Sequence, residues 1–134
     1  MKVNNILKSL VFNGFMLTLS VKAFAQQDQR KVRIAKLEIY PADLDAYKAA
    51  LAEHAKTAVQ IEPGVFALQA VQDKMHPELF TVLEVYASED AYQFHLKTPH
   101  FLKYKNSTLK MVKSLQLVEV EPVALEIKAE LLMK

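Results

Sequence analysis

The residues best suited to acid–base chemistry gather in one stretch of this 134-residue chain, from Glu84 to Tyr104. The stretch holds one glutamate at its start, three tyrosines, and two of the four histidines, His95 and His100. Because an imidazole titrates near neutral pH, it can take the proton of a phenol. We therefore predict His95 as a general base and Glu84 as the carboxylate that orients it. The side chains expected to line a substrate pocket beside them are Tyr86, His100, Phe101 and Tyr104.

Both of the predicted catalytic residues also have structural interpretations. His95 could be a helix histidine that fastens the helix to the sheet through a carboxylate such as Glu84. Glu84 alternates with Val82 and Tyr86 in a mostly apolar strand. A carboxylate is costly there unless it is paired or protonated, so it could instead bond a backbone group or a tyrosine.

The rest of the chain offers few other reaction centres. His54 lies beside the apolar stripe of the expected first helix and is interpreted as structural, while His76 falls in a loop. No two histidines form an H-x-H or H-x-x-x-H pair, and the chain has no cysteine, two glycines and no serine in a nucleophile elbow. We therefore predict no metal and no bound cofactor.

The apolar periodicity and the turn residues predict the elements that must position these groups. We expect strands at residues 32–40, 65–72, 78–86 and 115–121, a helix at 44–61, and a second helix that Ser88 caps, Pro99 splits and that ends near residue 114. This order is that of a ferredoxin-like α+β domain, here spanning residues 32–122.

Two helices cover only one face of such a sheet, yet both faces of the predicted strands are partly apolar. Phe80 and Val82, for example, alternate with Leu79, Leu83 and Val85. A second apolar face needs a cover, so we expect a homodimer formed through the sheets. The pattern of the C-terminal tail, residues 123–134, leaves a partner-exchanging strand and a loose helix equally open.

The N-terminus has the features of an export signal. Lys2 and Lys8 precede an apolar run, and Ala23-Phe24-Ala25 forms an A-x-A cleavage site. We predict a signal peptide at residues 1–25 and a polar linker at 26–31, so that the mature protein is periplasmic or secreted. The apolar run is short for a membrane span, although an uncleaved anchor is the alternative.

Loss of this signal changes the charge of the chain. It removes three of the 17 basic residues, so the 15 acidic residues then outnumber them. The mature domain therefore lacks the basic excess of a nucleic-acid-binding protein.

Several short motifs resemble, in order and spacing, the antibiotic biosynthesis monooxygenase family. They are Glu62-Pro63-Gly64-Val65, Glu84-Val85-Tyr86, Ser88 to Tyr92, His95, and Thr98 to Phe101 with Tyr104. The resemblance implies a dimeric α+β barrel with a cavity between helices and sheet. The family includes cofactor-free quinol oxygenases, and a relative of the family degrades haem. That branch is disfavoured here, because the aligned position of the haem ligand falls at about Tyr104-Lys105, where there is no histidine, although His95 or His100 could ligate iron from elsewhere.

Together, the residues and the resemblance predict a cofactor-independent monooxygenase that oxidises a small quinol or phenol with O₂. Once deprotonated, such a substrate is electron-rich enough to pass an electron to O₂ without a cofactor. The protein would then need only a base, hydrogen-bond donors and a cavity poor in water. An isomerase that shuttles a proton on a small carbonyl compound is an alternative function. A non-catalytic dimer that binds a small aromatic is another.

Overall fold

The computed structural model describes residues 28–131. The predicted signal peptide at residues 1–25 lies outside the described residues, as do residues 26 and 27 of the linker and residues 132–134 of the tail.

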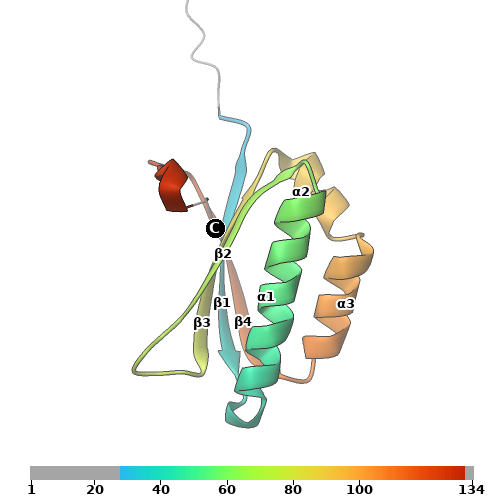
Figure 1. Cartoon of the computed structure of the whole chain (residues 1–134), viewed down its shortest axis with the longest axis vertical. Coiled ribbons are helices and arrows are strands. Elements are labelled where there is room, and N and C mark those ends of the chain that lie inside the picture. The colour runs from blue at the N-terminus through green and yellow to red at the C-terminus, as the bar shows by residue number, and fades with distance from the viewer. Residues whose placement is uncertain (1–27, 132–134) are drawn as a thin grey trace, which may run out of the picture.

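A four-stranded antiparallel sheet forms the centre of the domain (Figure 1). Its strands are β1 (Lys31–Ile39), β2 (Val65–Gln72), β3 (Leu79–Tyr86) and β4 (Val112–Val120), in the order β2-β3-β1-β4. In the register of the central pair, Arg33 lies opposite Glu84 of β3, and Arg33 also lies opposite Glu119 of β4. The first and last strands of the domain are therefore neighbours, and the predicted ferredoxin-like α+β fold is confirmed.

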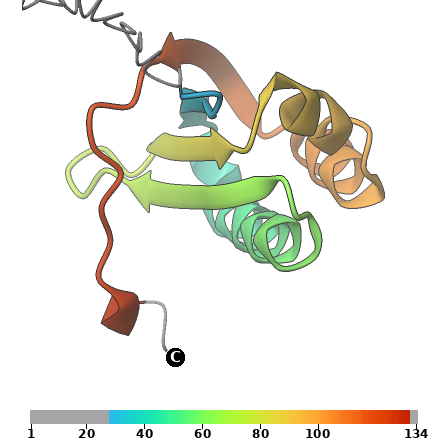
Figure 2. The ribbon, with the colours of Figure 1, turned by 90° about the horizontal axis from the view of Figure 1, so that it is seen from above.

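Three helices pack on one face of this sheet (Figures 1 and 2). They are α1 (Leu44–Ile61), α2 (Glu89–His95) and α3 (Pro99–Thr108). The hydroxyl of Ser88 accepts a hydrogen bond from the Ala91 N–H and so caps α2, as the sequence predicted. The hydroxyl of Thr98 caps α3 in the same way, and Pro99 occupies the first turn. The predicted helix is thus split at Pro99 into two helices that meet at an angle.

The end of α3 differs from the prediction. The helix ends at Thr108 rather than near residue 114, and β4 begins at Val112 rather than at residue 115. Pairing with β1 accounts for the difference, because Val112 lies opposite Ile39 and the Tyr40 N–H donates to the Met111 carbonyl. Hydrogen bonds to a strand distant in sequence therefore override the local helical pattern of these residues.

The main core lies between the sheet and α1. Tyr47 of α1 is fully buried and packs edge-on against Phe80, with ring centroids 5.1 Å apart. The other buried members of this core are Ala35, Leu37, Ile39, Leu51 and Val82. Burial of these side chains fixes α1 on the sheet.

The opposite face of the sheet is partly covered by the segment after β4. Val32 and Val85 point to this face, since Arg33 and Glu84 beside them point toward the helices, and both valines are nevertheless buried. Figure 2 shows the chain after β4 running on the side away from the helices, toward the β2 edge. Pro122 and Leu125 of this segment are half-buried. Within the described residues 123–131, the tail forms one short 3-10 turn at Ala129–Leu131 and is otherwise neither helix nor strand.

No helix within residues 28–131 is long and apolar enough to cross a membrane.

Candidate active site

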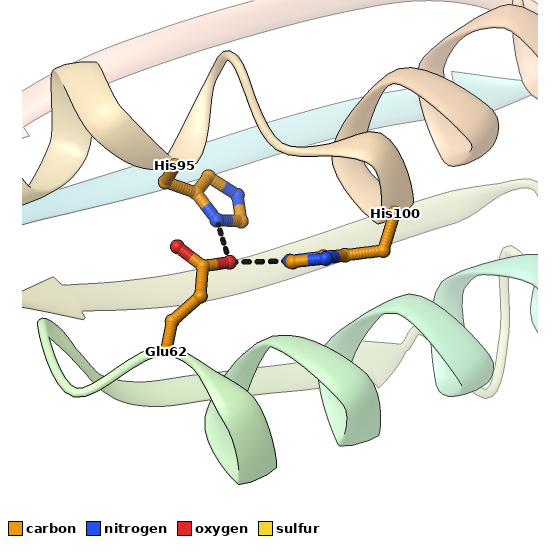
Figure 3. A group of neighbouring side chains, drawn as sticks. All are labelled: Glu62, His95 and His100. Atoms are coloured by element: carbon orange, nitrogen blue, oxygen red, sulfur yellow. Dashed lines mark hydrogen bonds and ion pairs between the residues drawn. The ribbon is translucent and has the colours of Figure 1, made fainter.

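A buried carboxylate joins the two histidines of the Glu84–Tyr104 stretch (Figure 3). Glu62, at the C-terminal end of α1, places one carboxylate oxygen, Oε1, 2.8 Å from Nδ1 of His95. The same oxygen contacts Nε2 of His100. His95 and Glu62 are only 2% and 5% exposed. The three side chains come from α1, α2 and α3, so this cluster ties together all three helices.

A close approach at Gly64 allows this arrangement. A Cβ added to Gly64 would lie 2.6 Å from the Cβ of Ala91, so any larger residue would push α2 away from the turn after α1. The Gly64 carbonyl also accepts a hydrogen bond from the Ala87 N–H, just before α2. Gly64 therefore brings His95 within reach of Glu62.

The contacts with Glu62 show which nitrogen of each imidazole ring carries a proton that is donated to the carboxylate. An ionised carboxylate only accepts hydrogen bonds, so His95 donates from Nδ1 and His100 donates from Nε2. The other ring nitrogen of His95, Nε2, then carries a lone pair, and it makes no hydrogen bond within residues 28–131. Burial lowers the pKa of His95, partly offset by Glu62, and His100 lowers it further. Because of this lowered pKa, His95 is neutral and able to accept a proton at neutral pH.

His95 borders a cavity of about 480 Å³ between the helices and the sheet. The residues that line the His95 end are polar or aromatic: Arg33, His54, Glu84, Tyr86, Tyr92, Phe101 and Tyr104. Around Leu37 and its neighbour Leu115 on β4, the lining includes the apolar residues Leu109, Val112 and Leu117 together with Lys105, Lys113 and Ser114. Arg33 and Leu37 are four residues apart on the same face of β1, which corresponds to about 13 Å. The cavity therefore extends from polar and aromatic groups beside His95 to a region near Leu37 where several side chains are apolar.

A third histidine, His54 of α1, forms part of the cavity wall. Its ring stacks on that of Tyr104, with centroids 4.6 Å apart and planes 6° from parallel. The Tyr104 hydroxyl in turn lies 2.8 Å from the hydroxyl of Tyr47. His54 is buried, and its Nδ1 makes no hydrogen bond to any described residue. Burial, reinforced by the nearby His95 and His100, lowers the pKa of His54 to about 4, so this ring is neutral.

Glu84 does not contact His95, and the predicted pairing of these two residues is wrong. Its Oε2 instead accepts a hydrogen bond from the Tyr86 hydroxyl at 3.2 Å and lies 3.9 Å from Nε of Arg33. The reason is topological: β1 places Arg33 directly opposite Glu84, while the turn after α1 brings Glu62 under α2. Burial raises the pKa of Glu84, an effect that Arg33 and Tyr86 oppose.

The predicted pocket residues fall into two groups. Tyr86, Phe101 and Tyr104 lie on the cavity wall, although their role as substrate contacts stays a prediction. His100 does not line the cavity: the start of α3 at Pro99 turns its side chain to Glu62. The sequence interpretation did not single out Arg33, and it assigned Glu62 to a turn and a structural role to His54. Arg33 could have been identified from the sequence, because a cation on the mainly apolar, helix-facing side of β1 is unusual.

The sequence profile of the antibiotic biosynthesis monooxygenase family matches residues 32–107, more than half of the chain. The chain belongs to the antibiotic biosynthesis monooxygenase family. The resemblance deduced from the short motifs is thereby confirmed.

Solved structures of similar proteins agree with this assignment. A candidate antibiotic biosynthesis monooxygenase from Bacteroides thetaiotaomicron is 42% identical, with a TM-score of 0.73, over 75% of this chain and 97% of that chain. A candidate monooxygenase from Lactobacillus acidophilus is 33% identical, with a TM-score of 0.66, over 68% of this chain and 43% of that chain. A protein from Caulobacter crescentus at 22% identity, with a TM-score of 0.67, shares the fold. No curated protein matches this chain significantly.

In this member of the antibiotic biosynthesis monooxygenase family, Glu62, His95 and His100 also have the composition of a metal site. They offer two nitrogens and one oxygen that all lie within 4.8 Å of one another. The prediction of no metal relied on spacing in the sequence, and that reasoning is incomplete because the fold brings the three groups together. In the described arrangement, however, both nitrogens are directed at the same oxygen. This is the geometry of a hydrogen-bonded carboxylate rather than of three ligands around a common centre.

Proposed function

We propose that this chain is a cofactor-independent monooxygenase that oxidises a small quinol or phenol with O₂. The observation that carries the proposal is the orientation of His95. Glu62 holds its Nδ1, while the ring lies on the cavity wall with Nε2 unbonded among the described residues. A carboxylate that fixes the tautomer and stabilises the imidazolium is the arrangement that a general base requires. The family and the relatives support monooxygenase-like chemistry in general terms.

In the proposed reaction, Nε2 of His95 takes a hydroxyl proton from the substrate. The resulting phenolate transfers one electron to O₂, and the radical pair combines at a ring carbon to give a peroxide. Loss of water then gives a hydroxyquinone, so that one quinol and one O₂ yield one hydroxyquinone and one water. If the pair separates instead, the products are a quinone and hydrogen peroxide.

The test is O₂ uptake by residues 26–134 with a panel of reduced quinols. We expect uptake that saturates with substrate and falls to the autoxidation rate in His95→Ala. His76→Ala is the matched control, since His76 is an exposed loop histidine far from the cavity wall, and it should keep full activity. Added catalase returns half of the consumed O₂ only if peroxide is the product, and ¹⁸O₂ labels the hydroxyquinone only if oxygen is inserted.

Two other outcomes would replace this proposal. Solvent proton exchange on a small carbonyl compound without O₂ uptake would indicate an isomerase that uses the same histidine. Saturable binding of an aromatic ligand without any turnover would indicate a binding module.

We also propose a homodimer formed through the sheet face that the helices leave uncovered. Ile34, Leu83 and Val118 on this face are only half-buried by the rest of the chain. Sedimentation velocity of the protein and of Ile34→Asp should show a dimer for the first and a monomer for the second. A monomeric parent protein would contradict the proposal.

Export remains a proposal as well. Mass spectrometry of the protein recovered from expressing cells should show cleavage after Ala25. An intact N-terminus would favour the anchor.

A further inference from the structure

Arg33 is a buried cation that makes no side-chain hydrogen bond to the described residues. It is 4% exposed, it lines the His95 end of the cavity, and its Nε makes no hydrogen bond within residues 28–131. Its nearest carboxylates, on Glu84 and Glu119, lie 3.9 and 3.8 Å from Nε, beyond hydrogen-bonding distance. The guanidinium packs over the ring of Tyr92 at 4.4 Å. Nε itself is closed off from the cavity, but the Nη groups of the guanidinium also make no hydrogen bond within residues 28–131. A buried guanidinium without an acceptor is costly, so a ligand oxygen that accepts from these Nη groups would complete the site.

The charges around Arg33 define the kind of acceptor that fits. Lys31 is paired with Glu89 at 2.6 Å and with Glu119 at 2.9 Å, and Arg33 itself is flanked by Glu84 and Glu119. The two cations, Lys31 and Arg33, are therefore surrounded by three carboxylates, those of Glu84, Glu89 and Glu119. A carboxylate ligand would lose its hydration without meeting a net positive charge. A carbonyl or hydroxyl oxygen would satisfy the guanidinium without that penalty.

Arg33 and His95 border the same end of the cavity but from different elements. The Tyr86 ring lies 5.4 Å from His95 and 5.2 Å from Tyr92, the ring on which Arg33 packs. The two tyrosine rings therefore lie between His95 and Arg33, and a flat ligand that lies along them would extend from one group toward the other.

We infer that Arg33 is a specificity-determining residue that donates a hydrogen bond to a second, uncharged oxygen of the substrate, remote from the oxygen that His95 deprotonates. This inference rests on the proposed function, because it assigns the second recognition point of the same cavity. It predicts that the enzyme selects neutral aromatics with two oxygens over those with one oxygen and over those whose second group is a carboxylate. The rest of the substrate lies toward the region near Leu37 and Leu115.

The test is calorimetric binding under argon, so that no oxidation occurs. The three probes are 1-naphthol, with one oxygen, 1,4-dihydroxynaphthalene, with a second neutral oxygen, and 4-hydroxy-1-naphthoate, with a carboxylate. For the wild-type protein, we expect the diol to bind about tenfold to hundredfold more tightly than 1-naphthol, as a hydrogen bond to a charged group predicts. We expect the carboxylate to bind no more tightly than 1-naphthol.

Variants assign the preference to Arg33. In Arg33→Met, the diol and 1-naphthol should bind within about threefold of each other. Arg33→Lys keeps the charge beside Glu84 but lacks the guanidinium fork, so it tests the donor if the methionine variant does not fold. Lys103→Met is the control, because Lys103 is exposed and pairs with Glu53 away from the cavity.

The outcomes separate this inference from the proposed function. Equal binding of diol and 1-naphthol to the wild-type protein would overturn the role of Arg33 while leaving the cavity and the base in place. A preference for the diol that persists in both Arg33 variants would do the same. Failure of all three probes to bind, together with no O₂ uptake, would remove the proposed function and this inference with it.

Discussion

Replacement of His54 with phenylalanine should remove a large part of the acid sensitivity of this protein. His54 is buried on α1, where its ring stacks on Tyr104, and phenylalanine preserves the stacked ring. Burial first, and then the nearby His95 and His100, lower the pKa of His54 from 6.5 to about 4. In the unfolded chain the pKa returns to about 6.5.

The difference between these two pKa values gives the size of the effect. Between pH 6.5 and pH 4 the unfolded chain binds a proton at His54 that the folded protein does not, so the free energy of unfolding falls as the pH falls. Each unit of pKa difference corresponds to about 1.4 kcal/mol, so the loss from this one histidine is about 3 kcal/mol by pH 4. Above pH 7 both states leave His54 neutral, and its titration contributes nothing there.

The measurement is urea unfolding of wild-type and His54→Phe protein by circular dichroism between pH 7.5 and pH 4. Protein concentration is held fixed, because a dimer would make the stability depend on it. We expect the difference in free energy of unfolding between the two proteins to shift by about 3 kcal/mol in favour of the variant across this range. At pH 7.5 two effects on the stability of the variant oppose each other. Loss of the unpaired, buried Nδ1 should stabilise it, and the larger volume of the phenylalanine ring should destabilise it.

Other groups also titrate in this range, and the comparison is designed to remove their contribution. Glu84, whose pKa is raised by burial, is present in both proteins, so its effect largely cancels in the difference. His76→Phe should follow the wild-type curve, since His76 is exposed. Parallel curves for wild-type and His54→Phe would refute the reasoning that His54 is held neutral by its surroundings.

Three other perturbations test the site. Glu62→Gln removes the charge that raises the pKa of His95. We therefore expect kcat to fall about tenfold or more, and the pH at which half of the activity is lost to move down. An unchanged pH profile of kcat would show that Glu62 does not act on the catalytic base. Gly64→Ala should cost about 1–3 kcal/mol in urea unfolding because its Cβ would meet Ala91, and a neutral result would mean that α2 shifts freely. Treatment with EDTA and removal of the chelator should leave O₂ uptake unchanged, whereas lost activity that Fe²⁺ or Zn²⁺ restores would make the Glu62 cluster a metal site.

The fold was predictable because its determinants are local. Ser88 and Pro99 each act on the turn of helix they begin, and the Pro63-Gly64 turn ends α1 close to where the periodicity predicts. The start of β4 was less predictable. It depends on hydrogen bonds to Tyr40 and on the register with Ile39, which are over 70 residues away in sequence and leave no local mark.

The candidate site was predicted only in part, because its contacts join residues that are distant in the sequence. His95 was identified because a histidine among aromatics is conspicuous in the sequence. Its partner was misassigned, because Glu84 and Glu62 are equally plausible carboxylates until the packing of α2 on the turn after α1 is known. His100 was predicted to line the pocket but contacts Glu62 instead, since the direction of a side chain at the start of a helix depends on how that helix packs on its neighbours.

The surroundings of Glu62 restrict how many protons the site can hold. Three imidazoles lie near a single buried carboxylate, which can compensate one positive charge but not two. Each additional imidazolium would be buried beside another cation, as the effect of His95 and His100 on the pKa of His54 illustrates. His95 is the member of this cluster that both contacts Glu62 and lines the cavity. The structure therefore suits a base that takes one proton from the substrate and must give it up before the next turnover.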